Sequence, residues 1–196
     1  MQSALKLFIA HVREEASKPS FVHHKWYLKY HIEIVEQIAT ELCTVYTSAD
    51  RELVQTLVWL HDYGKILGFE NDHEMTLLKG HEKLAELGFK KAWIDIAIKA
   101  AEVIDRKDPQ ELAKAAIEIQ IVSSADGAAH HTGPFFGIYW YENPDMRIED
   151  IMQSNIKKSL KDWDRKIVLP EVRVAFKQRR QFILEENGEL PRSYLK

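Results

Sequence analysis

Apolar residues recur at intervals of three and four along almost the whole chain, and this periodicity is the strongest constraint on the fold. It is clearest in two segments, 34–45 and 53–60, where the apolar residues would line one face of a helix. Asp50 stands where the second of these helices needs an N-cap. No segment alternates apolar and polar residues as a half-buried strand would. The pattern therefore predicts an all-α helical bundle.

Five further helices are predicted from the same periodicity and from residues that begin or end helices. Asp108-Pro109 is typical of an N-cap followed by proline at the first helical position, so we expect one helix to begin there and to run past Ile121. Segment 133–145 contains glycine, proline and several aromatic residues, and is predicted to be a loop or a short irregular helix. The other predicted helices cover about residues 73–87, 92–104, 148–165 and 170–186.

The length and composition are those of a single folded domain. The 196 residues are 45% hydrophobic and 29% charged, which provides enough apolar material for one core and is too apolar for a disordered chain. We expect residues 1–196 to form one helical domain with its core over about 20–135. Helices over about 148–187 are expected to pack on that core.

Charge and cysteine content exclude several classes of protein. The formal net charge of −3 gives no general attraction to nucleic acid or to acidic lipid, so we expect neither a nucleic-acid polymer nor a membrane as partner. The first fifteen residues mix apolar and charged side chains, unlike a signal-peptide core or a membrane span. The single cysteine, Cys43, cannot form an intrachain disulfide and fits a reducing compartment. We therefore expect a cytoplasmic protein.

Polar residues interrupt the apolar faces of three predicted helices. His31 and His61 each share a face with apolar residues three, four and seven positions away, and Asp126 follows apolar residues by four and seven positions. Asp62 adjoins His61. Because an unpaired buried carboxylate costs several kcal/mol or takes up a proton, these aspartates require a cation or hydrogen-bond donors. One or two divalent ions would satisfy all four groups. The nitrogen and oxygen ligands suit Mn, Fe, Co, Ni or Zn better than Ca, with Mg as a further candidate.

Each of these residues also has an ordinary structural interpretation. A single inward histidine is more often a hydrogen-bonded core residue than a ligand, and an inward aspartate is often a helix cap or an ion-pair partner. The combination favours the metal, since isolated His31, the doublet His61-Asp62 after an apolar run, and Asp126 after a second apolar run occur together.

This combination resembles the HD-domain metal-dependent phosphohydrolase superfamily, whose pattern is a histidine, a His-Asp doublet and a distal aspartate. The doublet begins the segment HDYGK at 61–65, which is similar to the common HD-x-G-K form of that family. The resemblance covers roughly residues 20–135. It implies an all-helical fold around the metal and, most often, hydrolysis of a phosphate ester.

The resemblance also implies roles for residues around the metal. We predict Asp62 and Lys65 as catalytic residues, with Asp62 holding the attacking water or bridging two metals and Lys65 binding phosphoryl oxygens. The alternative for Lys65 is a solvated charge at a helix end. His130 lies one turn after Asp126 and is predicted to contact substrate, although a surface pair with His131 would explain it equally well.

His81 and Glu102 are predicted to face inward, because both lie on apolar helix faces. Relatives with two metals usually carry further histidines on these middle helices. His81 matches that habit, whereas Glu102 stands where a histidine is more usual. The pair is therefore a candidate second metal site, and His81 is also a candidate substrate-binding residue. The alternative for Glu102 is a surface or ion-paired residue.

The predicted function is metal-dependent hydrolysis of a small phosphorylated metabolite, such as a nucleotide or another phosphomonoester. One alternative is an HD-type di-iron oxygenase, which would use the second metal site. Another is a module that binds a nucleotide without turning it over. The aromatic residues of 135–141 would form either a lid over the metal or a packing cluster.

Overall fold

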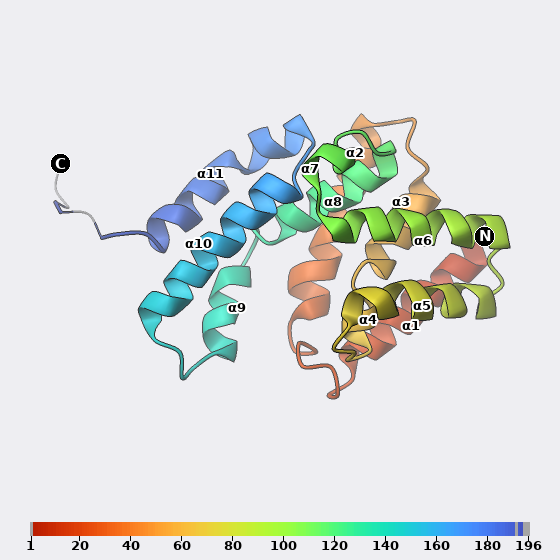
Figure 1. Cartoon of the computed structure of the whole chain (residues 1–196), viewed down its shortest axis with the longest axis horizontal. Helices are drawn as coiled ribbons and strands as arrows, with labels where there is room; N and C mark the ends of the chain where they lie inside the picture. The colour runs from red at the N-terminus through yellow and green to blue at the C-terminus, as the bar shows by residue number, and fades with distance from the viewer. Residues whose placement is uncertain (1, 191, 194–196) are drawn as a thin grey trace.

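Helices account for all the regular structure in the computed structural model, which describes residues 2–190 and 192–193 (Figure 1). The predicted all-α fold is therefore confirmed over the described residues. In chain order the elements are α1 (Gln2–Ser17), the π-helical turn η1 (Leu28–Ile32), α2 (Glu33–Val45), α3 (Arg51–Leu60), α4 (Tyr63–Ile66), α5 (Asp72–Glu86), α6 (Lys91–Arg106), α7 (Pro109–Leu112), α8 (Ile117–Ala129), α9 (Phe135–Glu142), α10 (Ile148–Arg165) and α11 (Pro170–Glu186).

Capping residues set the ends of several helices. Oδ1 of Asp50 accepts hydrogen bonds from the backbone N–H groups of Glu52 and Leu53 at the start of α3 (2.9 and 3.1 Å). Gly88 follows α5 with a φ of 83°, a left-handed conformation that glycine adopts without strain. Local capping chemistry therefore sets these two boundaries.

The single helix predicted from Asp108 past Ile121 is wrong. Asp108 does cap a helix, but this helix, α7, has only one turn. The chain then turns, and Ala116 takes a ψ of 150°, which is far outside the α-helical range, before α8 begins. A second difference is α1, which is absent from the helices that the sequence predicts. Its apolar face buries Phe8 and Val12 in the core.

α8 lies at the centre of the fold. It packs against η1, α2, α3 and α6 on one side and against α10 and α11 on the other (Figure 1). Every residue from Ile121 to Ala129 is buried as a result. A polar side chain in this buried stretch is shielded from bulk water, so Asp126 needs partners within the protein or in a cavity.

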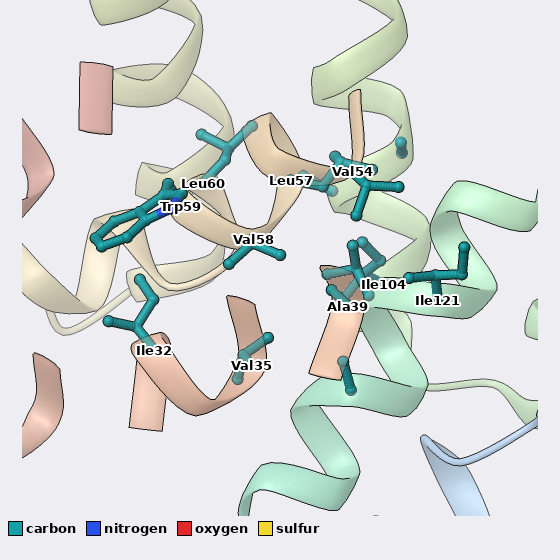
Figure 2. Close-up of a cluster of buried hydrophobic side chains, with 14 of the residues drawn as sticks. Ile32, Val35, Ala39, Val54, Leu57, Val58, Trp59, Leu60, Ile104 and Ile121 are labelled. Carbon is teal, nitrogen blue, oxygen red and sulfur yellow. The ribbon is translucent and has the colours of Figure 1, made fainter. Parts of the chain in front are cut away.

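The core beside the site is formed by α2, α3, α6 and α8 (Figure 2). Leu57 and Trp59 of α3 and Ile121 of α8 are completely buried there. Burial of each such side chain is worth roughly 1.5–3 kcal/mol. This packing fixes the C-terminal end of α3, where the His-Asp doublet stands. Separately, none of the described helices combines the length and hydrophobicity needed to cross a membrane.

Candidate metal centre

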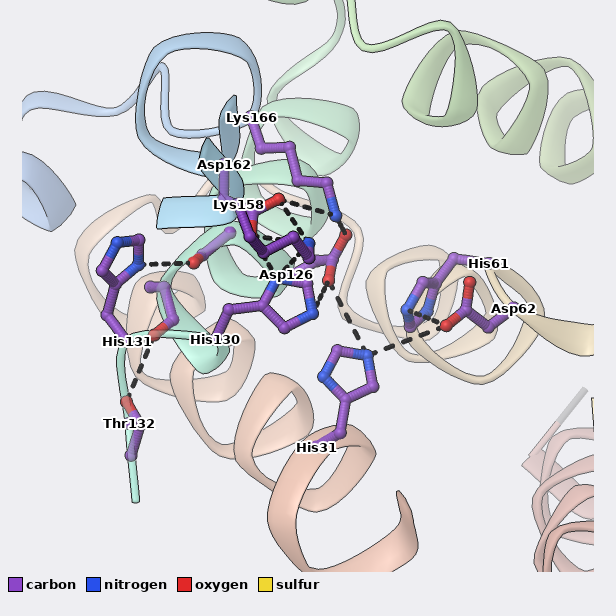
Figure 3. A network of polar contacts seen from close by, with 12 residues as sticks. His31, His61, Asp62, Asp126, His130, His131, Thr132, Lys158, Asp162 and Lys166 are labelled. Atoms are coloured by element: carbon purple, nitrogen blue, oxygen red, sulfur yellow. Dashed lines mark hydrogen bonds and ion pairs between the residues drawn. The ribbon is translucent and has the colours of Figure 1, made fainter. Parts of the chain in front are cut away.

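Three parts of the chain, far apart in sequence, direct polar side chains into one buried cluster (Figure 3). His31 comes from η1, the doublet His61-Asp62 from the end of α3, and Asp126 from α8. His31 is 3% exposed and occupies a π-helical turn, an irregularity that is common at functional sites. The structure thus brings together the four predicted metal ligands.

The two ring nitrogens of His61 differ in their hydrogen bonding. Its Nδ1 donates a hydrogen bond to the backbone oxygen of Val58 (2.7 Å), so the proton of the neutral ring is on Nδ1. Nε2 is buried, has no hydrogen-bond partner among the described residues, and lies 3.8 Å from Oδ2 of Asp62. A buried ring nitrogen with a free lone pair, beside a carboxylate, requires a cation or a donor.

Asp62 stands between α3 and α4, and its Oδ2 accepts hydrogen bonds from the hydroxyl of Tyr27 (3.1 Å) and from Nζ of Lys65 (3.0 Å). Burial alone would raise the pKa of the carboxyl. The positive charge of Lys65, with smaller contributions from His61 and His31, outweighs the effect of burial. The pKa of Asp62 is therefore held well below its usual range. Asp62 is therefore ionised at neutral pH.

The two oxygens of Asp126 face different partners. Oδ1 lies 3.7 Å from Nε2 of His31 and 3.7 Å from Nε2 of His130, whereas Oδ2 accepts a 2.6 Å hydrogen bond from Nζ of Lys166, with which it forms an ion pair. Burial opposes ionisation of Asp126, but Lys166 and the nearby histidines hold its pKa well below the usual range.

α10 supplies the remaining charges of the cluster. Asp162 is fully buried, and its Oδ2 is 2.8 Å from Nδ1 of His130. Nζ of Lys158 lies 2.8 and 2.6 Å from the two oxygens of the same carboxylate. Burial raises the pKa of Asp162, but His130, Lys166 and Lys158 together hold it far below the usual range. Each of the three carboxylates, Asp62, Asp126 and Asp162, is thus paired with a lysine.

The donor atoms fit a divalent ion. Within each of two groups, His31–His61–Asp62 and His31–Asp126–His130, one ligand atom per residue lies within 4.8 Å of the others. The groups share His31. Together with the free Nε2 of His61, they form the mixed imidazole and carboxylate set that transition-metal ions prefer.

A cavity of about 920 Å³ opens onto this cluster. Lys65 and Lys158 line it, and the aromatic residues of α9 cover one side. The ring of Phe135 lies 4.1 Å from that of His130, centroid to centroid. Glu142, at the other end of α9, accepts a hydrogen bond from the indole N–H of Trp26 (2.6 Å). The 135–141 segment therefore forms a helical wall of the cavity that packs directly on the cluster.

His81 and Glu102 do not join the cluster, and the prediction that they face inward is wrong. The buried face of α5 is formed by Thr76, Gly80 and Leu84, and His81, one residue beyond Gly80, is exposed. Oε1 of Glu102 instead lies 2.8 Å from a guanidinium nitrogen of Arg106 on the same helix. Neither residue lines the cavity, so the structure brings together neither the proposed second metal site nor a substrate contact by His81.

The two histidines after Asp126 differ in their surroundings. His130 belongs to the cluster, whereas His131 points away from it. Nδ1 of His131 donates to the backbone oxygen of Gly127 (2.9 Å), and its Nε2 is 3.0 Å from the hydroxyl of Ser159. His131 is thus buried and satisfied by ordinary hydrogen bonds, so a surface pair of His130 and His131 is wrong.

Sequence reasoning missed Tyr27 and the three charged residues of the C-terminal part. Lys158, Asp162 and Lys166 recur every four residues. This spacing is typical of ion pairs along a solvent-exposed helix face, so it carries no signal of a buried site. Only the docking of α10 on α8 turns this face inward.

Comparison with known protein families matches residues 28–166 to the HD domain. The matched segment runs from the start of η1 to Lys166, so it includes every residue of the cluster except Tyr27. No curated protein and no solved structure gives a significant match.

Proposed function

Because this chain belongs to the HD domain family, we propose that it is a metal-dependent phosphohydrolase that acts on a small phosphorylated metabolite. HD domains are mostly metal-dependent hydrolases, and a nucleotide or another phosphomonoester is the substrate we favour. The ion would be held by His31, His61, Asp62 and Asp126, with Mn, Fe, Co, Ni, Zn or Mg as candidates.

The charge balance of the cluster carries this proposal. The ion pairs Asp62–Lys65, Asp126–Lys166 and Asp162–Lys158 leave the three carboxylates already neutralised. The imidazoles of His31 and His130 are neutral at pH 7, because burial lowers the pKa of His31 well below its usual value of 6.5 and that of His130 to about 4. A divalent ion added to this set leaves the floor of the cavity positively charged, which favours a phosphate group over a neutral ligand.

Two residues are placed to act on such a substrate. Lys65 lies beside Asp62 with 40% of its side chain exposed, so its ammonium can contact a phosphoryl oxygen without leaving the cluster. Asp62 is ionised and acts as a ligand and hydrogen-bond acceptor, which allows it to orient an attacking water molecule. A bound divalent ion would supply Lewis acidity, which polarises a phosphate oxygen and acidifies water.

The reaction is hydrolysis of a phosphate ester. Water adds to phosphorus in line with the ester oxygen, the phosphorus–oxygen ester bond breaks, and an alcohol or nucleoside leaves with one proton. Lys65 neutralises negative charge on the phosphoryl oxygens as the bond breaks. The cavity of about 920 Å³, walled by Trp26 and Phe135, has room for the organic part of the substrate.

The two alternative functions have less support. A di-iron oxygenase needs ligands for a second ion, and the residues predicted for that role, His81 and Glu102, lie outside the cavity. A module that only binds a nucleotide would not need all four ligands, and all four are present and close together.

Metal analysis and a substrate panel test the proposal. Protein purified without added metal is analysed for ion content and then assayed, with each candidate ion, against phosphomonoesters and phosphodiesters. We expect hydrolysis by the wild type and by the control variant Glu102→Gln, and loss of both metal and activity in Asp126→Asn. If the metal-loaded wild type cleaves no ester of the panel, the proposed hydrolase function is wrong.

A further inference from the structure

We infer that His130 is an additional ligand of the metal ion, and that Asp162 positions it by fixing the proton on its other ring nitrogen. This inference rests on the metal site of the proposed function and is independent of the reaction. It replaces the substrate contact predicted for His130 from the sequence.

The position of His130 matches that of His31, one of the four proposed ligands. Its Nε2 lies 3.7 Å from Oδ1 of Asp126, the same separation as Nε2 of His31 from that oxygen. The two imidazole rings are nearly parallel, with centroids 4.9 Å apart. Figure 3 shows His31 and His130 directed at the same carboxylate oxygen.

A separation of 3.7 Å is too long for a hydrogen bond and close to the spacing of two ligands on one ion. Bonds of about 2.0–2.2 Å that meet at angles of roughly 90–110° place neighbouring ligand atoms about 3–3.5 Å apart. An ion between Oδ1 of Asp126 and the two Nε2 atoms therefore requires these side chains to move by only a few tenths of an ångström.

Asp162 decides which nitrogen of His130 is free. The carboxylate is ionised, because Lys158 lies within 2.8 Å of both of its oxygens, and an ionised carboxylate can only accept. The 2.8 Å contact between Oδ2 of Asp162 and Nδ1 of His130 must then be an N–H donor bond. Nε2 is left with its lone pair directed at the cluster. A carboxylate behind a ligating histidine is a common arrangement in metal sites.

Lys158 does not compete for Nδ1. Its ammonium is 3.2 Å from that nitrogen, but it makes shorter contacts, of 2.8 and 2.6 Å, with the two oxygens of Asp162. If Nδ1 were instead the acceptor from Lys158, its lone pair would face the carboxylate oxygen at 2.8 Å, which is repulsive.

Cobalt binding tests this inference without any activity measurement. Protein stripped of metal is titrated with Co²⁺, while the affinity and the visible absorption of the bound ion are recorded. We expect His130→Gln to weaken Co²⁺ binding at least tenfold and to change the absorption spectrum. Asp162→Asn should weaken binding about 10- to 100-fold, as expected for a partner behind a ligand. The matched control is His131→Gln, an adjacent buried histidine outside the cluster, which should bind Co²⁺ like the wild type.

X-ray absorption of the Co²⁺-loaded wild type provides a second measurement that requires no variant. Three imidazole ligands are expected, from His31, His61 and His130, whereas two would overturn the inference. Unchanged Co²⁺ affinity and spectrum in folded His130→Gln would also overturn it. If three imidazoles are found but no ester is cleaved, the ligand assignment stands and the proposed hydrolase function fails.

Discussion

Lys166 and Asp126 form a buried ion pair in which the lysine contacts one carboxylate oxygen, while the other oxygen faces two histidines. Nζ of Lys166 is 2.6 Å from Oδ2 of Asp126, and Oδ1 faces His31 and His130. Both side chains are less than 10% exposed. The pair joins the end of α10 to α8 and directs Oδ1 alone toward the cluster.

Replacement of Lys166 by methionine should make the stability of the protein depend on metal. Removal of one partner from a buried pair leaves an uncompensated charge and costs about 3–5 kcal/mol, so the metal-free variant should unfold at lower urea concentration. A divalent ion supplies the missing positive charge. The increase in Tm on addition of Co²⁺ or Zn²⁺ should therefore be larger for Lys166→Met than for the wild type. Lys161→Met, an exposed position on the same helix, is the control. Equal increases in Tm would contradict this role.

Lys65→Met should separate metal binding from turnover. Lys65 is not a ligand, so the metal content should stay near that of the wild type. Loss of a cation that stabilises negative charge in the transition state is expected to lower kcat by about 10²-fold. Metal analysis together with steady-state kinetics on any ester cleaved by the wild type checks both parts. A variant that loses its metal would show that Lys65 acts on the ion site instead.

Gly64→Ala should disrupt the packing of α4 on α5. A Cβ atom at position 64 would lie 2.0 Å from the backbone oxygen of Asp72 and 2.7 Å from the backbone nitrogen of Thr76. Backbone atoms cannot move away without displacing α5, so we expect a loss of about 3 kcal/mol or more of unfolding free energy.

The matched control for Gly64→Ala is Gly137→Ala. Gly137 lies in helix α9, and a Cβ atom there would meet no other described residue within 4 Å, so alanine should be neutral or stabilising by up to about 1 kcal/mol. Urea denaturation followed by circular dichroism compares the two variants. Similar midpoints would show that the glycine of the HDYGK segment is not required for packing.

His11 should contribute to the pH dependence of stability. It joins α1 to α4 through a 2.7 Å hydrogen bond to the hydroxyl of Tyr63. Burial, with a smaller contribution from Lys83, lowers its pKa below the usual 6.5. The unfolded chain therefore binds this proton more readily than the folded protein. The stabilisation is complete above about pH 6.5 and is lost as the pH falls toward the lowered pKa of His11.

The variant His11→Gln tests this pH dependence, because glutamine keeps a hydrogen-bonding group but does not titrate. The difference in urea midpoint between wild type and variant should be constant above pH 7. Below pH 6.5 it should shift in favour of the variant. Parallel midpoints from pH 7.5 to 5.5 would mean that His11 has no such role.

The sequence by itself determined the helical fold and most of the proposed ligand set. Both depend on spacing along a single helix, which places His31 and His61 on apolar faces and Asp126 one and two turns after apolar residues. The same reasoning failed at His81, because an apolar helix face need not be a buried one. Leu78, three residues before His81, is itself 49% exposed.

The tertiary structure alone decided which charges surround the ligands. Lys158, Asp162 and Lys166 form a charged stripe that would be ordinary on a solvated helix, and they become part of the site only because α10 packs on α8. Local spacing determines which side of a helix a residue occupies. The environment that this side meets depends on packing between segments distant in sequence, and that environment sets the charge balance of the site.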